Sequence, residues 1–258
     1  MTDRASGPAV GIVCNRDHDV FADVAGRLRC RGAAVEFFEP GVEVSERAVG
    51  CLDLLANKKA DPASLRALRR ARDRGVATWN GPLALLLAAR FVGYRALAAA
   101  GFRVPASSAA PPAGDYVAKT AVDWHFEPDP ELNGTGDVYQ PLLPTDGVDR
   151  KYYAVDTGDR VRVSVVRATS KLRGEKERLE TVRPDPGLAA ATRRLVRLVG
   201  AQALGVDVVY SGGEPYAVDV NPAMSFRGTG MAPELAASML ARLPERTADA
   251  VSPPAASR

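Results

Sequence analysis

The side chains of Asp207, Asp219 and Asn221 carry the oxygen ligands that Mg²⁺ prefers in proteins. Such an ion commonly takes one or two carboxylates from a protein and fills its other positions with water and the phosphates of a nucleotide. Acids that merely face water on an exposed strand are also common, and Asp-x-Asn by itself is more typical of that bland arrangement. A metal site is therefore predicted only if the fold brings Asp207 beside the other two residues.

A β-hairpin would bring these three residues together. The runs Val206–Tyr210 and Tyr216–Val220 are rich in β-branched and aromatic residues, and the Ser-Gly-Gly-Glu between them supplies the positive φ of a tight turn. Because side chains alternate along a strand, Asp219 and Asn221 share one face. Folding back at the glycines places Asp207 opposite Asp219, within one residue of register. The sequence thus predicts one polar, oxygen-rich face with hydrophobic residues behind it.

Strands alternating with helices are predicted for the first eighty residues. Strand patterns occur at Ala9–Cys14, Val35–Phe38, Cys51–Leu55 and Val76–Trp79. A helix is expected from about Val20 to Arg31, and Asp61 followed by proline marks the start of another. This order predicts a small parallel α/β lobe, whose functional loops lie beyond the carboxyl ends of the strands.

The remainder of the chain predicts a long helix and further strands. The Ala/Leu-rich helix is expected to run from Pro82 to about Ala100, and a second Asp-Pro helix start occurs at Asp185. Strands are expected at Tyr116–Lys119, Asp137–Leu143, Lys151–Val155 and Arg160–Ala168. We predict four segments: an N-terminal α/β lobe (1–82), a lid lobe (83–140), a C-terminal lobe with the metal site (141–243) and a disordered tail (244–258) rich in Pro, Ala and Ser.

The composition indicates an ordinary globular protein. Of its 258 residues, 46% are hydrophobic and 25% charged, and the net charge of +3 lacks the dense Lys/Arg clustering of a nucleic-acid binder. Three cysteines without metal-ligand spacing favour a reducing compartment. No apolar run reaches the length of a membrane span, and the polar start lacks a signal-peptide core. We therefore expect a cytoplasmic protein without nucleic-acid or membrane partners.

From Ala9 to about Leu240, the order of these elements and motifs resembles the ATP-grasp superfamily. The resemblance is to carboxylate–amine ligases of the kind that add glutamate to a ribosomal protein, with features of the inositol-phosphate kinase branch. It implies an α/β and α+β architecture in which residues 1–82 precede two α+β lobes that enclose ATP. It also implies ATP and Mg²⁺ as cofactors, and paired N-terminal lobes make a homodimer possible.

The resemblance assigns nucleotide contacts to five residues. Arg90, near the start of the long helix, and Lys119, on the first lid strand, match the cations that contact the α- and β-phosphates. Gln140 and Leu143 match the hinge that holds adenine, and Leu142 contributes backbone groups there. Without the family, the two cations would be interpreted as surface charges and the hinge as a plain strand end.

The same resemblance assigns six further residues. Asp207, Asp219 and Asn221 match the family's metal ligands. Arg167 and Arg227 match cations near the transferred phosphate and the acceptor, where they would stabilise an acylphosphate and a tetrahedral intermediate. Lys151 lies in a segment that resembles the one following the hinge and is expected to be a third catalytic cation. The chain departs from the family in two places. Asp219 stands where glutamate is usual, and only Asn133-Gly134-Thr135-Gly136 remains of the glycine-rich loop over the phosphates.

Three functions stay open at this point. A ligase would phosphorylate a carboxylate with ATP, and an amine would then displace phosphate, with no protein nucleophile required. The acceptor would be a small molecule or a peptide. A kinase for a polyol or inositol phosphate is favoured by the motif Asp-x-Asn. It is also favoured by positively charged side chains that would suit a phosphorylated acceptor: the lysines of Asn57-Lys58-Lys59, Lys119 and Lys151, together with His125. A catalytically degenerate nucleotide-binding protein is suggested by the trimmed loop. We place the ligase first.

Overall fold

The computed structural model describes residues 7–126, 129–170, 172 and 177–244. Its strands form a parallel sheet and two antiparallel sheets, as the predicted α/β and α+β class requires. The tail predicted for 244–258 lies, from residue 245 on, outside the described residues. No helix in the described part of the chain is long and apolar enough to span a membrane.

The N-terminal lobe is a four-stranded parallel sheet in the order β2-β1-β3-β4. Its strands are β1 (Ala9–Val13), β2 (Ala34–Phe38), β3 (Leu54–Asn57) and β4 (Ala77–Trp79). Its helices are α1 (Asp19–Arg29), α2 (Glu46–Gly50) and α3 (Pro62–Asp73). The prediction of a parallel lobe is confirmed, but its third strand begins three residues late. Ser45 caps the unpredicted helix α2, which extends to the C-cap Cys51 and so delays the strand.

The long helix predicted from Pro82 to Ala100 is interrupted, so that prediction is wrong in its continuity. The segment divides into α4 (Pro82–Leu85), a 3₁₀ turn (Leu86–Ala88) and α5 (Arg90–Ala99). Ala89 is extended, with ψ of 107°, and it pairs with Val122 in an isolated β-bridge. This tertiary pairing interrupts a sequence of high helix propensity. As a result, Arg90 is the first residue of α5.

A small lid sheet follows in the order β6-β5-β7. It consists of β5 (Tyr116–Lys119), β6 (Glu131–Leu132) and β7 (Val138–Pro141), all antiparallel. The predicted strands at 116–119 and 137–143 are both present, whereas β6 was not predicted. Residues 127–128, in the connection between β5 and β6, lie outside the described residues.

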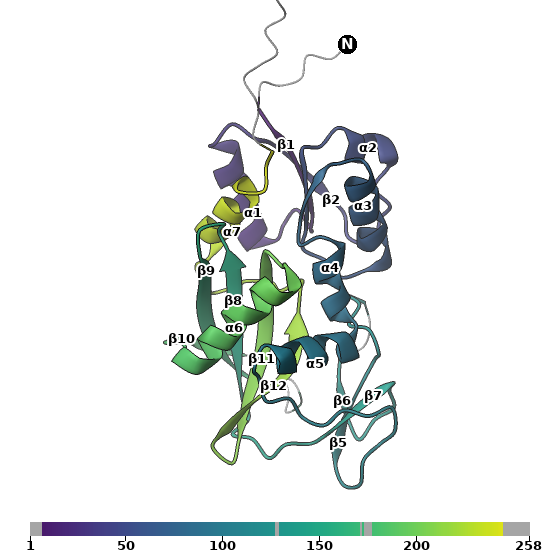
Figure 1. The fold of residues 1–258 in the computed structure, drawn as a ribbon, viewed down its shortest axis with the longest axis vertical. Helices are drawn as coiled ribbons and strands as arrows, with labels where there is room; N and C mark the ends of the chain where they lie inside the picture. The colour runs from purple at the N-terminus through teal and green to yellow at the C-terminus, as the bar shows by residue number, and fades with distance from the viewer. Residues whose placement is uncertain (1–6, 127–128, 171, 173–176, 245–258) are drawn as a thin grey trace, which may run out of the picture.

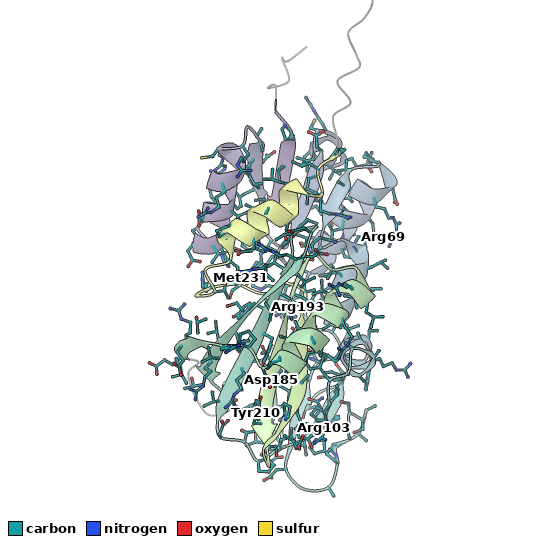
Figure 2. All side chains as sticks on the ribbon, turned by 60° about the vertical axis from the view of Figure 1, so that its left-hand side comes forward. Arg69, Arg103, Asp185, Arg193, Tyr210 and Met231 are labelled. Carbon is teal, nitrogen blue, oxygen red and sulfur yellow. The ribbon has the colours of Figure 1, made fainter. Side chains whose placement is uncertain are left out.

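The C-terminal lobe is a five-stranded antiparallel sheet in the order β10-β9-β8-β11-β12, covered by α6 (Pro186–Val199). Its strands are β8 (Val148–Asp156), β9 (Val161–Thr169), β10 (Arg178–Val182), β11 (Ala203–Ser211) and β12 (Glu214–Asn221). Asp185 caps α6 by accepting a hydrogen bond from the Leu188 amide, 2.9 Å away, which confirms the predicted Asp-Pro start. Figure 2 shows Asp185 at the beginning of this helix, which lies along the sheet.

Helix α7 (Ala232–Leu240), the last one in the described part of the chain, returns to the N-terminal lobe and packs against α1. In Figure 1 these two helices lie side by side near one end of the molecule, and the lid sheet lies at the other end. One hydrophobic core joins Ile12, Phe21 and Trp79 to Leu235 of α7 and to Tyr153 of the five-stranded sheet. The N-terminal and C-terminal lobes therefore share buried residues.

Asn80, directly after β4, connects these two lobes through its buried side chain. Its Oδ1 accepts hydrogen bonds from the amides of Gln202 and Ala203, at 3.0 and 2.9 Å, and its Nδ2 donates to the carbonyls of Ala203 and Pro222, at 2.7 and 2.9 Å. Its φ of 49° lies in the left-handed region, which asparagine tolerates better than most residues. This one side chain satisfies four backbone groups of the C-terminal lobe.

We expect Asn80→Ala to lower the free energy of unfolding by at least about 2 kcal/mol, because it leaves buried backbone groups without partners and places alanine at positive φ. Urea unfolding followed by circular dichroism measures the loss. Asn80→Gly is the matched control, since glycine adopts this φ without strain but makes no side-chain hydrogen bonds. If both variants were as stable as the wild type, Asn80 would not join the lobes energetically.

Candidate functional site

The predicted hairpin exists, and its register sets the centre of the site. β11 and β12 pair with Asp207 directly opposite Asp219, and the turn glycines Gly212 and Gly213 have φ of 59° and 82°. On its other side, β11 pairs with β8 so that Asp207 lies opposite Lys151. Lys151, Asp207 and Asp219 therefore form one row across three neighbouring strands, and their side chains share one face of the sheet.

The oxygen atoms at this row fit a divalent cation. Asp207 Oδ1 is buried and has no hydrogen-bond partner among the described residues. Asp219 accepts from the Val220 amide at Oδ1, at 3.0 Å, and from Arg90 at both oxygens, and Asn221 Oδ1 accepts from the Ala223 amide at 2.6 Å. A carboxylate has about four lone-pair sites and an amide oxygen has two, so Asp219 Oδ2 and Asn221 Oδ1 each keep one for a cation. In the described part of the chain no three His, Cys, Asp or Glu residues cluster as metal ligands. Two carboxylates and one amide suit Mg²⁺, which usually keeps several water or phosphate ligands.

Lys151 supplies a positive charge to this row. Its Nζ donates to Asp207 Oδ2 and lies 3.9 Å from Asp149 Oδ2, and the residue is only 6% exposed. Burial disfavours the ammonium, but the carboxylate of Asp207 outweighs it and raises the pKa of Lys151. Lys151 is therefore a permanently charged neighbour of the predicted metal ligand.

Arg90 connects the start of α5 to the metal row. Its Nη1 lies 3.1 and 3.0 Å from the two carboxylate oxygens of Asp219, its Nη2 lies 2.9 Å from Asp123 Oδ1, and its Nε donates to the Thr120 carbonyl at 2.9 Å. The residue is 2% exposed. Both carboxylates raise the pKa of the guanidinium against the opposing effect of burial. The geometry of arginine suits this arrangement, because lysine could not bind both carboxylates and the carbonyl in the same fork.

Lys119, at the end of β5, reaches from the lid sheet to β12 of the C-terminal sheet. Its Nζ donates to the Val218 carbonyl at 2.7 Å and to the Tyr94 hydroxyl at 3.1 Å. Burial lowers the pKa of Lys119 to about 8, although the nearby Asp219 acts in the other direction. An anion bound beside this ammonium would favour its charged form.

These side chains line a cavity of about 460 Å³ between the three sheets. Nine of the eleven predicted site residues are in its wall: Arg90, Lys119, Gln140, Leu142, Leu143, Lys151, Asp207, Asp219 and Asn221. The volume is within the range of small-molecule sites. Apolar residues such as Pro141 and Val209 share the wall with the charged ones. The cavity thus has a charged region and an apolar region.

The apolar region contains the predicted adenine hinge. Gln140 is buried and its Nε2 donates to Ser107 Oγ at 3.0 Å, which orients the amide. The backbone N–H of Leu142 already donates to the Asp115 carbonyl at 2.9 Å, so Leu142 has its carbonyl to offer to a ligand. Leu143 contributes apolar surface. The candidate glycine loop 133–136 is not part of the cavity wall.

Arg167 and Arg227 are not brought to the cavity. Arg167 pairs with Arg150 across β8 and β9, which places it on the sheet face opposite to Lys151, and its Nη1 contacts Glu180 Oε1 at 2.6 Å. Arg227 contacts Asp19 Oδ1 at 3.0 Å, at the start of α1, and its side chain is 59% exposed. The structure therefore offers no support for a direct role of either residue at the cavity.

Three acids of the cavity wall, Asp123, Asp129 and Asp149, were not predicted. Asp123 binds Arg90, and both its burial and the charge of Asp219 raise its pKa. Asp149 lies beside Lys151. The sequence places Asp123 only in a polar segment, and its position depends on the bridge between Ala89 and Val122, which no local pattern indicates. Asp149, two residues before Lys151 on the same strand, could have been found from strand alternation.

Lysines follow β3 at the other end of the cavity. Lys59 lines the cavity and its Nζ lies 2.7 Å from His125 Nε2, whereas Lys58 donates to the Ala223 carbonyl at 2.7 Å. Lys58 and Lys59 are 6% and 7% exposed. Burial and the charge of Lys59 lower the pKa of Lys58 to about 8. At pH values at which Lys58 is protonated, its buried ammonium lowers the stability of the folded protein.

This shift predicts a pH dependence of stability. An unfolded lysine has a pKa of about 10.4, so between about pH 8 and pH 10 the unfolded state binds more protons at Lys58 than the folded state does. The contribution of Lys58 to the free energy of unfolding should then rise with pH, by up to about 1.4 kcal/mol per unit, and be constant below pH 8. Urea unfolding of wild type and Lys58→Met from pH 7 to pH 10 measures the difference. A difference that does not change with pH would contradict the assignment.

Comparison with known proteins gives a fold likeness but no sequence match. No protein-family model matches the chain, and no curated protein matches it. Among solved structures, the ATP-grasp ligase PsnB complexed with a minimal precursor is 17% identical, with a TM-score of 0.66 over 90% of this chain and 99% of that one. A RimK domain ATP-grasp protein from Sphaerobacter thermophilus DSM 20745 is 18% identical, with a TM-score of 0.68 and the same coverage.

A third similar structure is the macrocyclase MdnC from Microcystis aeruginosa MRC, bound to its precursor peptide MdnA. It is 9% identical to this chain, with a TM-score of 0.65 over 90% of this chain and 99% of MdnC. Identities this low establish similarity of fold alone. All three alignments extend over nearly the whole of the compared chains.

Proposed function

Because the chain has the ATP-grasp fold of these ligases, we propose that it is an ATP- and Mg²⁺-dependent ligase that joins a carboxylate to an amine through an acylphosphate. The observation that carries the proposal is the row formed by Lys151, Asp207 and Asp219 in the wall of one cavity that also contains the hinge residues. A nucleotide needs this combination of oxygen ligands, cations and an apolar slot.

In this proposal different residues of the cavity wall bind the adenine, the phosphates and the metal ion of Mg·ATP. Gln140, Leu142 and Leu143 hold the adenine, and Lys119 and Arg90 face the phosphates. Asp207, Asp219 and Asn221 would hold Mg²⁺, which neutralises phosphate charge when it is bound. PsnB has been solved with Mg and ADP, which supports the use of both by a protein of this fold.

The reaction needs no protein nucleophile. An oxygen of the substrate carboxylate attacks the γ-phosphorus of ATP, the bond to the β–γ bridging oxygen breaks, and ADP leaves. The neutral amine then attacks the acyl carbon, phosphate leaves with the electron pair of the C–O bond, and the nitrogen releases one proton to water to give the amide. Lys151, fixed by Asp207, offers a positive charge next to the transferred group. Arg167 and Arg227 would have to act from outside the cavity wall.

The acceptor is proposed to be a small molecule or a peptide. PsnB and MdnC were both solved with precursor peptides, so the fold accommodates a peptide in those proteins. A second candidate function, phosphorylation of a hydroxyl on a phosphorylated polyol, is favoured by Lys59 and His125 in the cavity wall. Cationic groups at that position suit an acceptor that carries phosphate.

The test is turnover of ATP by the full chain with paired carboxylate and amine libraries, with ADP and phosphate measured separately. We expect phosphate release that requires Mg²⁺, a carboxylate and an amine together. ADP formed with a phosphorylated alcohol would favour the kinase. Tight binding of Mg·ADP without turnover on any acceptor would favour a degenerate nucleotide-binding protein, and the short lid sheet is consistent with that outcome. EDTA in place of Mg²⁺ is the control.

A further inference from the structure

The two ends of the cavity differ in charge balance. At the metal row Arg90 is paired with Asp219 and Asp123, and Lys151 is paired with Asp207. The third buried cation there, Lys119, donates to the Val218 carbonyl and the Tyr94 hydroxyl and has the charge of Asp219 nearby. At the other end, neither Lys58 nor Lys59 makes an ion pair with an acid of the described residues. Both lysines are nonetheless buried. Buried cations without a counter-charge are costly, so this end of the cavity favours an anion.

The charged groups around the two lysines do not remove this imbalance. Asp61 is buried nearby, but both of its oxygens are used at the start of α3, where they accept from the amide and the hydroxyl of Ser64 at 2.8 and 2.7 Å. Glu39 and Asp61 influence Lys59 only at longer range. Arg227 adds positive charge and is itself paired with Asp19. The net field at this end is therefore positive.

Lys59 is held in position to face a ligand. Its Nζ is 2.7 Å from Nε2 of His125, and the backbone N–H of His125 donates to the Ala60 carbonyl at 2.7 Å. Because an ammonium can only donate, His125 accepts through Nε2 and is neutral in this pair. Burial and Lys59 both lower the pKa of His125, which agrees with the neutral form. Lys59 retains further N–H groups, and His125 contributes orientation but no charge.

Resting on the proposed ligase function, we propose that this end of the cavity binds a carboxylate group of the acceptor, through Lys59 oriented by His125. Lys59 comes from the loop after β3 and His125 from the segment after β5, so the site joins the N-terminal lobe to the lid lobe. A carboxylate there would supply the missing negative charge and accept the remaining ammonium hydrogens. Lys58, which points to the Ala223 carbonyl and is absent from the cavity wall, adds only to the field.

Glutarate is the probe, and the imidazole of His125 is the reporter. The chain has two histidines, and His18→Gln identifies which imidazole NMR signal belongs to His125. In the presence of saturating Mg·ADP and at constant ionic strength, glutarate should shift the His125 signal saturably. Lys59→Met should weaken glutarate binding at least tenfold, Lys59→Arg should restore most of it, and Lys58→Met should change it by less than about threefold.

Binding of Mg·ADP, measured by calorimetry, separates this inference from the proposed function and shows that each variant is folded. If the wild type does not bind Mg·ADP, the proposed function fails whatever glutarate does. If Mg·ADP binds normally but glutarate does not shift His125, or shifts it equally in Lys59→Met, the carboxylate site is wrong. A response to inorganic phosphate with none to glutarate would also overturn it, and would point to a phosphate ester as the acceptor.

Discussion

Asp219→Asn is expected to lower the rate of ATP-dependent product formation on the order of a thousandfold, with the fold retained. Asparagine has the same shape and keeps an oxygen for the Val220 amide, but it removes the negative charge opposite Asp207. Two carboxylates in this row would then become one, and the site would hold a divalent cation far more weakly. The loss should appear in kcat as well as in the Mg²⁺ concentration needed for half-maximal rate.

Asp123→Asn is the matched control for this prediction. It also removes one carboxylate partner of Arg90, but it is not among the predicted metal ligands. We expect it to lower the rate about tenfold or less. Direct titration of Mn²⁺ in the presence of ADP, followed by electron paramagnetic resonance, should show weaker metal binding only in Asp219→Asn. A fully active Asp219→Asn enzyme would exclude the metal assignment.

Arg90→Met is expected to lower the free energy of unfolding by about 3 kcal/mol, the lower end of the cost of breaking a buried ion pair, because it leaves the partly buried carboxylates of Asp219 and Asp123 without their shared cation. The carboxyl of Asp123, whose pKa is already raised by burial, should then take up a proton at higher pH still. The Thr120 carbonyl would also lose its donor. Arg90→Lys should recover only part of the loss, since lysine cannot bind all three groups at once.

A double-variant cycle tests whether this loss comes from the ion pair. If the uncompensated carboxylate is the cause, Arg90→Met combined with Asp219→Asn should be more stable than Arg90→Met alone, despite the additional substitution. Chemical unfolding of the four proteins at pH 7 gives the interaction energy. Strictly additive losses would show that Arg90 stabilises α5 by packing and not through its charge.

Local patterns in the sequence were enough for the parallel lobe and the hairpin. Strand periodicity, glycine turns and Asp-Pro helix starts act within a few residues, so they predicted the pairing of Asp207 with Asp219 and the cap at Asp185. The contacts of Arg90 were beyond this kind of reasoning. They depend on the bridge between Ala89 and Val122, which only the folded chain brings together.

The position of Arg167 could have been found from the sequence. Val161, Val163 and Val165 occupy alternate positions of β9 and so lie on one face of the strand, and Arg167 occupies the next position on that face. Because these valines pack against α6, Arg167 lies on the face of the sheet that is turned away from the cavity. The family resemblance placed an arginine on the correct strand, but strand alternation decides which face it occupies.

The return of α7 to the N-terminal sheet bears on how the chain folds. Phe21 and Leu235 belong to one core, although more than two hundred residues of chain separate them. During synthesis, the face of the sheet that carries Ile12 must stay partly uncovered until α7 has left the ribosome. Such long-range closure slows folding and exposes apolar surface for longer. The N-terminal lobe therefore cannot complete its core first and wait for the remaining lobes, and its folding is tied to α7, a helix that is made more than two hundred residues after Ile12.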